Sequence, residues 1–417
     1  MTDATEARQT GPLTGLRIVE FGHFIAAPFA TRVLGDLGAE IIKIEPPSGD
    51  PVRSWGEQLD GKSLWWSSHA RNKKSVCLNL KDPAAREIAL GLVAKCDAVI
   101  ENFRPGQMEK FGLGPDDLVS VKPGCILVRI SGFGQTGPRA MEPSFGMIGE
   151  ALGGIRHLTG HPPEVSDLPP VRTGVSLGDT VAGLYGAIGL LAALHEQKGL
   201  TLPQDTPVRI VDVALTESVL SLLEGVLPEY GALGKVRRPE GARLPAAAPS
   251  SAYACADGTF ILIGANSDPL FTRLMRVMDR DALIDDPRFI DNPARVANID
   301  AIDDEISSWT KSREPEALLA ELQAAGIPSS KIYTAADIVA DPQYQARGAV
   351  QSVRDPVLGQ DILQPAPVPR FDGDNPEGIA WPGPAIGEHT EAVLKGLLNL
   401  SDEDYRRLQD SGTIGSA

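Results

Sequence analysis

The sequence predicts an α/β protein whose larger domain is built on a mostly parallel, Rossmann-like sheet. Short apolar strand patterns alternate with helical patterns through the first half of the chain, and this alternation is typical of βαβ units. A second, smaller α+β domain is expected, because 417 residues exceed what one ordinary hydrophobic core accommodates. With 42% hydrophobic and 23% charged residues, the composition is that of a globular protein.

Six strands of the predicted sheet come from the first half of the chain. A helix is expected near Pro28–Leu37, and a second begins at Asp82-Pro83 and runs to about Lys95. Asp at that place caps a helix, and Pro fits the first helical position. The predicted strands are Leu16–Phe21, Glu40–Glu45, Ser75–Leu80, Ala98–Phe103, Cys125–Ser131 and Val208–Val213.

The stretch from Pro170 to Lys198 combines a loop of small residues with about five turns of apolar helix. Three glycines recur every third residue along it, Gly183, Gly186 and Gly189. Each costs roughly 1 kcal/mol against Ala in a helix, so they indicate a close backbone approach. Asp179 lies where the loop becomes the helix. An N-cap, worth about 1 kcal/mol, is the interpretation that the residues alone favour. A carboxylate that attacks an activated acyl group is the alternative.

The second half of the chain is expected to hold the smaller domain and a long tail. A helix over Ala214–Leu227 precedes a Gly- and Pro-rich linker at Gly231–Pro249. A strand at Phe260–Gly264 and three helices follow, and Ser330–Thr334 is predicted to return the chain to the first domain. The predicted division is 1–229, 230–330 and 331–417, with a Pro- and Gly-rich tail at 365–388 before a last helix. The three helices are expected at Leu270–Met278, Ile299–Thr310 and Glu314–Ala325.

Charge argues against nucleic acid as a partner. The formal net charge is −16 at pH 7, and an acidic surface repels a phosphate backbone. An anionic ligand therefore needs a local group of Lys and Arg. Five cationic residues lie near predicted strand ends, where open parallel sheets bind ligands. They indicate either a site for a polyanionic small ligand or a solvated charged face. The five residues are Arg71, Lys73, Lys74, Arg104 and Lys110.

Several other functions are not supported by the sequence. The turn after the first strand reads GHFIAAP and lacks the GxGxxG that lets backbone meet a pyrophosphate, so NAD binding is not expected. The four cysteines are widely spaced, which argues against a metal site and for reduced thiols in a cytoplasmic protein. The start of the chain has no signal-like apolar core, and no uninterrupted apolar run is long enough to predict a membrane span.

Ordered motifs along nearly the whole chain resemble the class III CoA-transferase family, which includes formyl-CoA and carnitine-CoA transferases and acyl-CoA racemases. The motifs are PLTGLRIVEFGHFIAAPFATRVLGDLGAEIIKIEPPSGD, RNKKSVCLNLKDP, DAVIENFRPGQMEKFGLG, ISGFGQTGP, RTGVSLGDTVAGLYG, VDVALTESVL, GIPSSKIYT, DPQYQARG and GEHTEAVL.

The resemblance implies that Asp179 is the nucleophile. Its carboxylate would attack an acyl-CoA thioester and form, in turn, an acyl-aspartyl anhydride and an aspartyl-CoA thioester. CoA is then a substrate, and no metal or redox cofactor is implied. The resemblance also implies an interlocked, ring-like homodimer. The positions that match CoA contacts in the family are Ile25, Ala26, Leu78 to Lys81, Asn102, Phe103, Arg104 and Lys110.

Departures from the family pattern narrow the expected reaction. Ile25 and Pro46 replace a glutamine and an arginine of formyl-CoA transferase, and Pro245–Ala252 replaces its glycine-rich flap, so formyl or oxalyl transfer is not expected. The His-Asp pair of the racemase branch is replaced by Phe145-Gly146. Acyl-CoA racemisation or intramolecular CoA isomerisation stays as the alternative function.

The overall pattern, especially SLWWSSHARNKKSVCLNL, is closest to transferases that move CoA from succinyl-CoA to a small carboxylic acid. The candidate acids are citramalate, itaconate, mesaconate, glutarate and sulfinopropionate. Arg172, seven residues before Asp179, is expected either to hold a distal carboxylate or to form a structural salt bridge.

Overall fold

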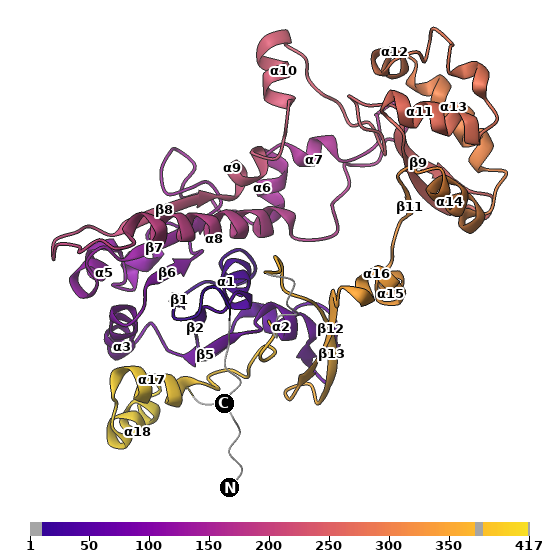
Figure 1. Ribbon diagram of the computed structural model, residues 1–417. Coiled ribbons are helices and arrows are strands. Elements are labelled where there is room, and N and C mark those ends of the chain that lie inside the picture. The colour runs from indigo at the N-terminus through magenta and orange to yellow at the C-terminus, as the bar shows by residue number, and fades with distance from the viewer. Residues whose placement is uncertain (1–10, 372–377, 416–417) are drawn as a thin grey trace. The chain divides into compact units, whose positions relative to one another are not determined.

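The computed structural model describes residues 11–371 and 378–415 and divides the chain into two compact units (Figure 1). Unit 1 comprises Met1–Ile155, Thr173–Pro228 and Gln343–Ala417, and unit 2 comprises Arg156–Arg172 and Glu229–Pro342. The division near 229 lies where the sequence predicts it. The second unit, however, ends at 342 rather than 330, and it also takes in 156–172.

Unit 1 is built on a six-stranded parallel sheet with the order β5-β2-β1-β6-β7-β8. Five of the six strands overlap their predicted ranges closely, and β2 matches its range at both ends. β5 begins two residues before its predicted start, which places Lys73 and Lys74 at its amino end. The strands are β1 (Arg17–Glu20), β2 (Glu40–Glu45), β5 (Lys73–Cys77), β6 (Ala98–Glu101), β7 (Ile126–Ser131) and β8 (Arg209–Ala214).

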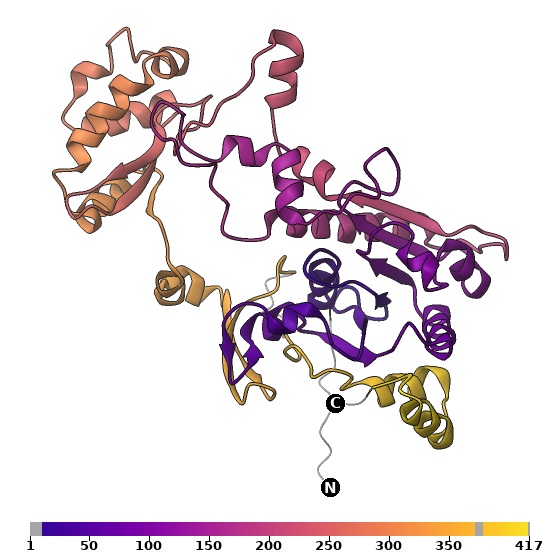
Figure 2. The ribbon, with the colours of Figure 1, turned by 180° about the vertical axis from the view of Figure 1, so that it is seen from behind.

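Helices cover both faces of this sheet, as a parallel sheet requires (Figure 2). Alternate strand residues serve the two faces: Ile18 packs in a cluster with α1 (Ala26–Asp36) and α8 (Leu177–Gln197). Its neighbour Val19 packs in the opposite cluster with α3 (Pro83–Ala94) and α17 (Thr390–Leu398). Asp82 caps α3 by accepting the Ala84 N–H at 2.9 Å, as predicted.

The strand order reverses at the centre of the sheet. Counted along the chain, the strands lie in the order 3-2-1-4-5-6, so β1 has β2 on one side and β6 on the other. The connections leaving β1 and β6 therefore run to opposite sides of the sheet and open a crevice at their carboxyl ends. Open α/β sheets bind ligands at this switch point.

The glycines of α8 bring that helix against its own unit. A Cβ on Gly183 would lie 2.7 Å from the Ala26 carbonyl oxygen of α1. Cβ atoms on Gly186 and Gly189 would lie 2.8 Å from Ile130 Cδ1 and 2.5 Å from Val211 Cγ1, on β7 and β8. The close approach that the sequence predicts is thus to α1 and the sheet. By length and hydropathy alone α8 resembles a membrane-spanning helix, but these contacts make it a core helix of unit 1.

Shorter elements of unit 1 connect the sheet strands and form its rim. The predicted helix over Ala214–Leu227 is wrong, because the chain breaks after α9 near Glu224, which has a φ of 44°. Two helices, α9 and α10, take its place. The shorter elements are η1 (Pro51–Ser54), β3 (Gln58–Leu59), β4 (Lys62–Ser63), α2 (Leu64–His69), α4 (Gln107–Lys110), α5 (Pro115–Val121), α6 (Gly146–Leu152), α7 (Ile155–Leu158), α9 (Leu215–Leu220) and α10 (Val226–Leu233). The boundary between the units falls within α7 and within α10.

Unit 2 is a small α+β unit around a three-stranded antiparallel sheet of order β11-β10-β9. Its core includes Phe271, Ile306 and Leu322 from three helices. The predicted return of Ser330–Thr334 to the first unit is wrong, because β11 pairs with β10 inside this sheet. Its elements are β9 (Ser250–Ala254), β10 (Phe260–Gly264), α11 (Asp268–Val277), η2 (Asp281–Leu283), α12 (Asn292–Ala297), α13 (Ile299–Thr310), α14 (Pro315–Ala324), β11 (Ser329–Lys331) and α15 (Ala335–Ala340).

The C-terminal part returns to unit 1. After α16 (Pro342–Ala346), a hairpin of β12 (Val350–Asp355) and β13 (Gln360–Pro365) forms, which the sequence analysis missed. The described part of the tail then runs along β5 and α2: the Trp381 indole donates to the Lys73 carbonyl oxygen at 2.9 Å. α17 and a further helix, α18 (Asp402–Asp410), end the described chain.

Buried ion pairs link the central strands beneath the switch point. The Lys43 ammonium of β2 lies 2.7 Å from Glu20 Oε1 of β1 and 2.8 Å from Asp50 Oδ2, and the Lys73 ammonium of β5 lies 2.9 Å from Glu20 Oε2. All four side chains are at most 1% exposed. Although burial opposes ionisation, Lys43 and its neighbours hold the pKa values of Glu20 and Asp50 at about 2.

We expect Lys43→Met to lower the free energy of unfolding by about 3–5 kcal/mol, because two buried carboxylates lose their shared cation. Lys74→Met is the matched control: Lys74 also pairs with a carboxylate, Glu40, but about a third of its side chain is exposed. Its loss should stay below about 1 kcal/mol. Urea denaturation of both variants measures the difference, and equal losses would contradict the role given to the buried pairs.

Candidate active site

A pocket of about 240 Å³ lies at the carboxyl ends of four parallel strands in unit 1. Residues that follow β1, β6, β7 and β8 form its walls, so it occupies the crevice that the strand order creates. The start of α8 adds Asp179 to the same pocket. The lining residues are His23, Phe24, Ala26, Asn102, Phe103, Arg104, Pro105, Ile130, Ser131, Gly132, Ala140, Glu142, Ser144, Phe145, Asp179 and Leu215.

The Asn102 amide fastens together the two loops at the switch point. Its Oδ1 accepts the His23 N–H at 2.8 Å, and its Nδ2 donates to the His23 carbonyl oxygen at 2.8 Å. Gly22 makes this approach possible, because a Cβ there would lie 3.0 Å from Asn102 Oδ1 and 2.5 Å from the Ala27 Cβ. The His23 ring adds an edge contact with the Phe103 ring at 5.2 Å. Asn102 therefore fixes the shape of the pocket.

Asp179 is not the N-cap of α8. The helix begins at Leu177 and its N-cap is Ser176, so Asp179 is the third residue of the first turn. The capping interpretation is therefore wrong, because the helix starts earlier than the Gly178-Asp179 pair indicates. A carboxylate in the first turn interacts favourably with the positive end of the helix dipole. The side chain is partly buried and faces the pocket.

The first residue of α6 supports the Asp179 carboxylate. A Cβ on Gly146 would overlap Asp179 Oδ2, so only glycine leaves room for the carboxylate where it lies. The backbones of the two helix starts also approach each other closely: a Cβ on Gly178 would lie 2.7 Å from the Gly146 carbonyl oxygen. The starts of α6 and α8 thus meet through two glycines. Their packing determines where the carboxylate stands in the pocket.

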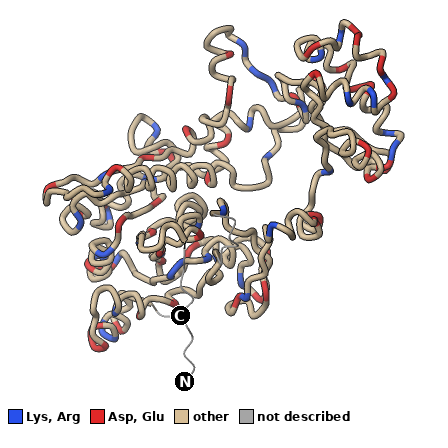
Figure 3. Tube along the Cα trace, in the orientation of Figure 1, with Lys and Arg blue, Asp and Glu red and all other residues tan. Residues whose placement is uncertain are grey.

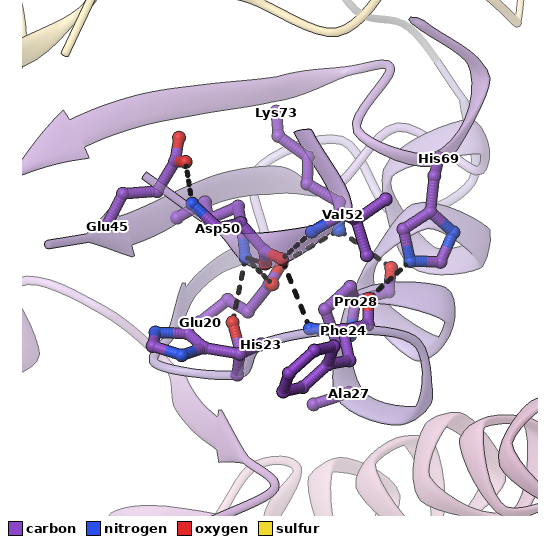
Figure 4. Close-up of polar contacts among 12 residues, drawn as sticks. Glu20, His23, Phe24, Ala27, Pro28, Glu45, Asp50, Val52, His69 and Lys73 are labelled. Carbon is purple, nitrogen blue, oxygen red and sulfur yellow. Dashed lines mark hydrogen bonds and ion pairs between the residues drawn. The ribbon is translucent and has the colours of Figure 1, made fainter. Parts of the chain in front are cut away.

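Phe24 enters the pocket from a left-handed backbone. Its φ is 61°, which is rare for a residue with a side chain and costs on the order of 1–3 kcal/mol. Two buried polar contacts hold it: Asp50 Oδ1 accepts the Phe24 N–H at 3.2 Å, and His69 Nε2 donates to the Phe24 carbonyl oxygen at 2.8 Å (Figure 4). Burial, with the positive charge of Lys73, lowers the pKa of His69 to about 3, so its ring is neutral.

A second ion-paired group orders the loop after β6. Burial raises the pKa of Glu101 to about 7 despite the Arg129 guanidinium, whose Nε lies 2.8 Å from Glu101 Oε1. The other Glu101 oxygen accepts the Phe103 N–H at 2.6 Å. Arg129 also pairs with Glu109 of α4 at 2.8 Å. These contacts fix the segment that carries Phe103 and Arg104 into the pocket.

The structure brings four of the predicted CoA contacts to the pocket. Ala26, Asn102, Phe103 and Arg104 line it together with Asp179. Lys81 and Lys110 are exposed and follow the carboxyl ends of β5 and β6, outside the lining. Ile25 and Leu78 are 7% and 0% exposed and pack in apolar clusters, so their side chains offer no ligand surface.

The predicted group of five cations does not form. Arg71 is 1% exposed and pairs with Asp36 at 2.6 Å, and Lys73 is buried against Glu20. Lys74 pairs with Glu40. Figure 3 shows Lys and Arg interspersed with Asp and Glu along both units. Of the five, Arg104 and Lys110 are the exposed residues after β6 that are available to an anionic ligand.

Sequence reasoning missed His23 and Phe24 of the lining, and it named Phe145 and Gly146 only as the replacement of the racemase pair, not as a lining residue and a contact of Asp179. His23 and Phe24 directly follow a correctly predicted strand, and the rule that ligands bind at strand ends could have identified them. No local signal marks Gly146 as the support of Asp179, because the contact joins residues far apart in the chain. Arg172 is exposed and belongs to unit 2.

Within the described residues 11–371 and 378–415, no group of three His, Cys, Asp or Glu side chains is arranged to hold a metal ion. The four cysteines are free, buried thiols. Burial raises the pKa values of Cys96 and Cys125 to about 12, so these thiols are protonated and inert at neutral pH. None of the four lines the pocket, whose two carboxylates are those of Asp179 and Glu142.

Comparisons with known proteins identify relatives along the whole chain. Residues 13–390 match the model of CoA-transferase family III. A Chloroflexus aurantiacus protein named succinyl-CoA–D-citramalate CoA-transferase is 42% identical over 98% of this chain and 99% of its own. The alpha subunit of a succinyl-CoA–L-malate CoA-transferase of that organism is 35% identical over 97% and 92% of the two chains. Human succinyl-CoA:glutarate CoA-transferase is 33% identical over 97% and 90%.

A solved structure agrees with the fold. The crystal structure of a CaiB/BaiF family protein from Brucella suis superposes with a TM-score of 0.80 and 32% identity. The match covers 93% of this chain and all of the other. The arrangement of a parallel sheet with a strand-order reversal is thus that of known CaiB/BaiF proteins.

Proposed function

The chain belongs to CoA-transferase family III, and we propose that it moves CoA from succinyl-CoA to a small dicarboxylic acid with Asp179 as the nucleophile. The observation that carries the proposal is the place of Asp179. Its carboxylate lies in the pocket at the switch point of the sheet, beside four of the positions that match CoA contacts in the family. The printed activities of the relatives, on citramalate, malate and glutarate, support the class of acceptor.

The proposed reaction has two symmetrical halves. A carboxylate oxygen of Asp179 attacks the thioester carbonyl of succinyl-CoA, the C–S bond breaks, and CoA leaves as the thiolate. The thiolate then attacks the aspartyl carbonyl of the anhydride, which releases succinate and leaves an aspartyl-CoA thioester. The acceptor carboxylate attacks this thioester, and the thiolate returns to the acceptor carbonyl and restores the Asp179 carboxylate. CoA is a substrate, and the scheme needs no metal or redox cofactor.

The residues around Asp179 have distinct tasks in this scheme. Gly146 holds the carboxylate in place without crowding it, and the first turn of α8 supplies the positive end of a dipole where negative charge moves. Arg104 brings a positive charge to the lining and is proposed to attract an anionic group of either substrate. Lys81 and Lys110 are proposed to meet the phosphates of CoA at the exposed edge of the sheet.

A homodimer of interlocked chains is part of the proposal. On α8, Leu184, Tyr185 and Ile188 are 43%, 40% and 59% exposed, opposite the face that packs on α1 and the sheet. Such a continuous apolar face favours burial against a second chain. A cytoplasmic location is proposed as well, because the four thiols are free and succinyl-CoA is an intracellular substrate.

The covalent role of Asp179 can be tested by trapping. After incubation with succinyl-CoA alone, digestion and mass spectrometry should find CoA on the peptide that contains Asp179, and hydroxylamine should convert it to the aspartyl hydroxamate. Asp179→Ala should give no adduct and should lose roughly 10³-fold or more in transfer rate. Full activity of this variant would overturn the proposal. Asp212→Ala is the matched control, since that carboxylate accepts the Gln135 N–H outside the pocket lining.

The acceptor class can be tested with a panel of acids. Given succinyl-CoA and citramalate, malate, itaconate, mesaconate, glutarate or sulfinopropionate, the enzyme should form at least one new CoA ester, detected by mass. Formate and oxalate should be poor acceptors. Conversion of a single acyl-CoA with no acceptor acid present would instead favour the racemase or isomerase alternative, and exchange only with monocarboxylates would contradict the dicarboxylate class.

Gly146→Ala should reduce kcat by on the order of 10²-fold, because the added methyl displaces the Asp179 carboxylate and a shift of about 1 Å is enough for that loss. Gly396→Ala on α17 is the matched control, since a Cβ there meets no atom within 4 Å. Circular dichroism checks that both variants are folded. Unchanged kcat in folded Gly146→Ala would contradict the support given to Asp179.

A further inference from the structure

Two hydrogen bonds to the backbone of Phe24 hold this residue, and with it the direction of its ring, more firmly than an ordinary loop residue. Its backbone N–H and carbonyl oxygen are both engaged, by Asp50 Oδ1 at 3.2 Å and by His69 Nε2 at 2.8 Å (Figure 4). Asp50 is itself fixed, because it pairs with Lys43 at 2.8 Å and accepts the Val52 N–H at 3.0 Å. The left-handed φ of 61° thus has supports on both sides of the residue, and it sets the direction of the side chain.

The Phe24 ring lies between two other aromatic rings. Its centroid is 5.9 Å from that of Phe145 in an edge-to-face contact of 88°, and 5.2 Å from that of Trp55. Phe24 and Phe145 line the pocket with Asp179, whereas Trp55 lies outside the lining. The two phenyl rings therefore form a continuous apolar wall of the pocket. This wall carries no group that could act as an acid or a base.

We propose that Phe24 determines specificity in the transfer reaction, by contacting the acyl group on Asp179 and by keeping water from the covalent intermediates. The proposal rests on the function proposed above. In the unwanted side reaction, a water oxygen attacks the aspartyl carbonyl and the C–S bond breaks. CoA leaves as the thiolate, the Asp179 carboxylate is restored, and the two protons of the water pass to solvent. The same attack by an acceptor carboxylate leads to transfer, so access of water and of acid decides between the two outcomes.

An apolar wall favours attack by the acceptor acid over attack by water in two ways. A phenyl ring gives no hydrogen bond to water, so water beside the aspartyl carbonyl is disfavoured. The same ring offers contact area to the methylene groups of an acyl chain. Removal of the ring should therefore increase hydrolysis and weaken discrimination by chain shape. A residue with a purely structural task would change the amount of active enzyme but would leave both ratios as they are.

The test compares Phe24→Ala and Phe24→Leu with the wild type and with Trp65→Leu as the matched control. Trp65 is an aromatic residue of the same region, 47% exposed, and it lies outside the pocket lining. Each protein receives succinyl-CoA with and without an acceptor acid. Free CoA measures hydrolysis and the new CoA ester measures transfer. The ratio of hydrolysis to transfer should rise by on the order of tenfold or more in Phe24→Ala, less in Phe24→Leu, and not in Trp65→Leu.

Acceptor choice gives the second readout. The ratio of kcat/KM for a bulky and a slender dicarboxylate, mesaconate and glutarate, should change in Phe24→Ala and stay constant in Trp65→Leu. Both ratios are independent of the fraction of folded enzyme, and Phe24→Leu provides them if the alanine variant does not fold. An Asp179 adduct with both ratios unchanged overturns this inference alone. Absence of the adduct in the wild type overturns it together with the proposed function.

Discussion

The geometry of the site depends on the buried ion pairs of the Lys43 ammonium. This ammonium lies among Glu20, Asp50 and the Gly22 carbonyl oxygen, with less than a tenth of its surface exposed, so it joins β1, β2 and the segments that follow both strands. Burial of a charge is costly unless each partner is in place. The two loops that leave the sheet here therefore have one arrangement that satisfies all the charges. Asp50 extends this order to Phe24, and Lys73 extends it to the Pro28 carbonyl oxygen in α1.

The site combines a Rossmann-like strand order with a turn that does not suit a dinucleotide. The crevice between β1 and β6 is closed at its base by Asn102, whose amide bonds both backbone groups of His23. In a dinucleotide-binding turn, glycines would leave that backbone open to a pyrophosphate. Here the turn is filled by side chains, and the proposed nucleophile comes from α8 instead. The common strand order thus fixes where a ligand binds, and the residues after each strand fix what chemistry is available.

The fold class could be predicted from the sequence because the patterns that indicate it are local. β2 was predicted at both ends, since a run of isoleucines is stopped by Pro46-Pro47, and the cap of α3 was read from Asp82-Pro83. The errors come from contacts between distant residues. Lys73 was interpreted as an exposed cation, because no residue near it in the chain indicates that Glu20 lies beside it in the fold. The left-handed Phe24 and the contact of Gly146 with Asp179 are hidden for the same reason, and the role of Asp179 rested on family motifs.

The parts of the pocket that hold Asp179 and the parts that are proposed to face the acyl group are made of different contacts. Close approaches at Gly146, Gly178 and Gly183 hold the proposed nucleophile and α8, and a Cβ at any of the three would displace a neighbour. The Phe24 and Phe145 rings face the pocket and leave those approaches untouched. A change of ring can therefore alter the shape available to an acid without moving the carboxylate that reacts with it. Changes at the ring positions would thus be compatible with one fold and one nucleophile serving different acceptor acids.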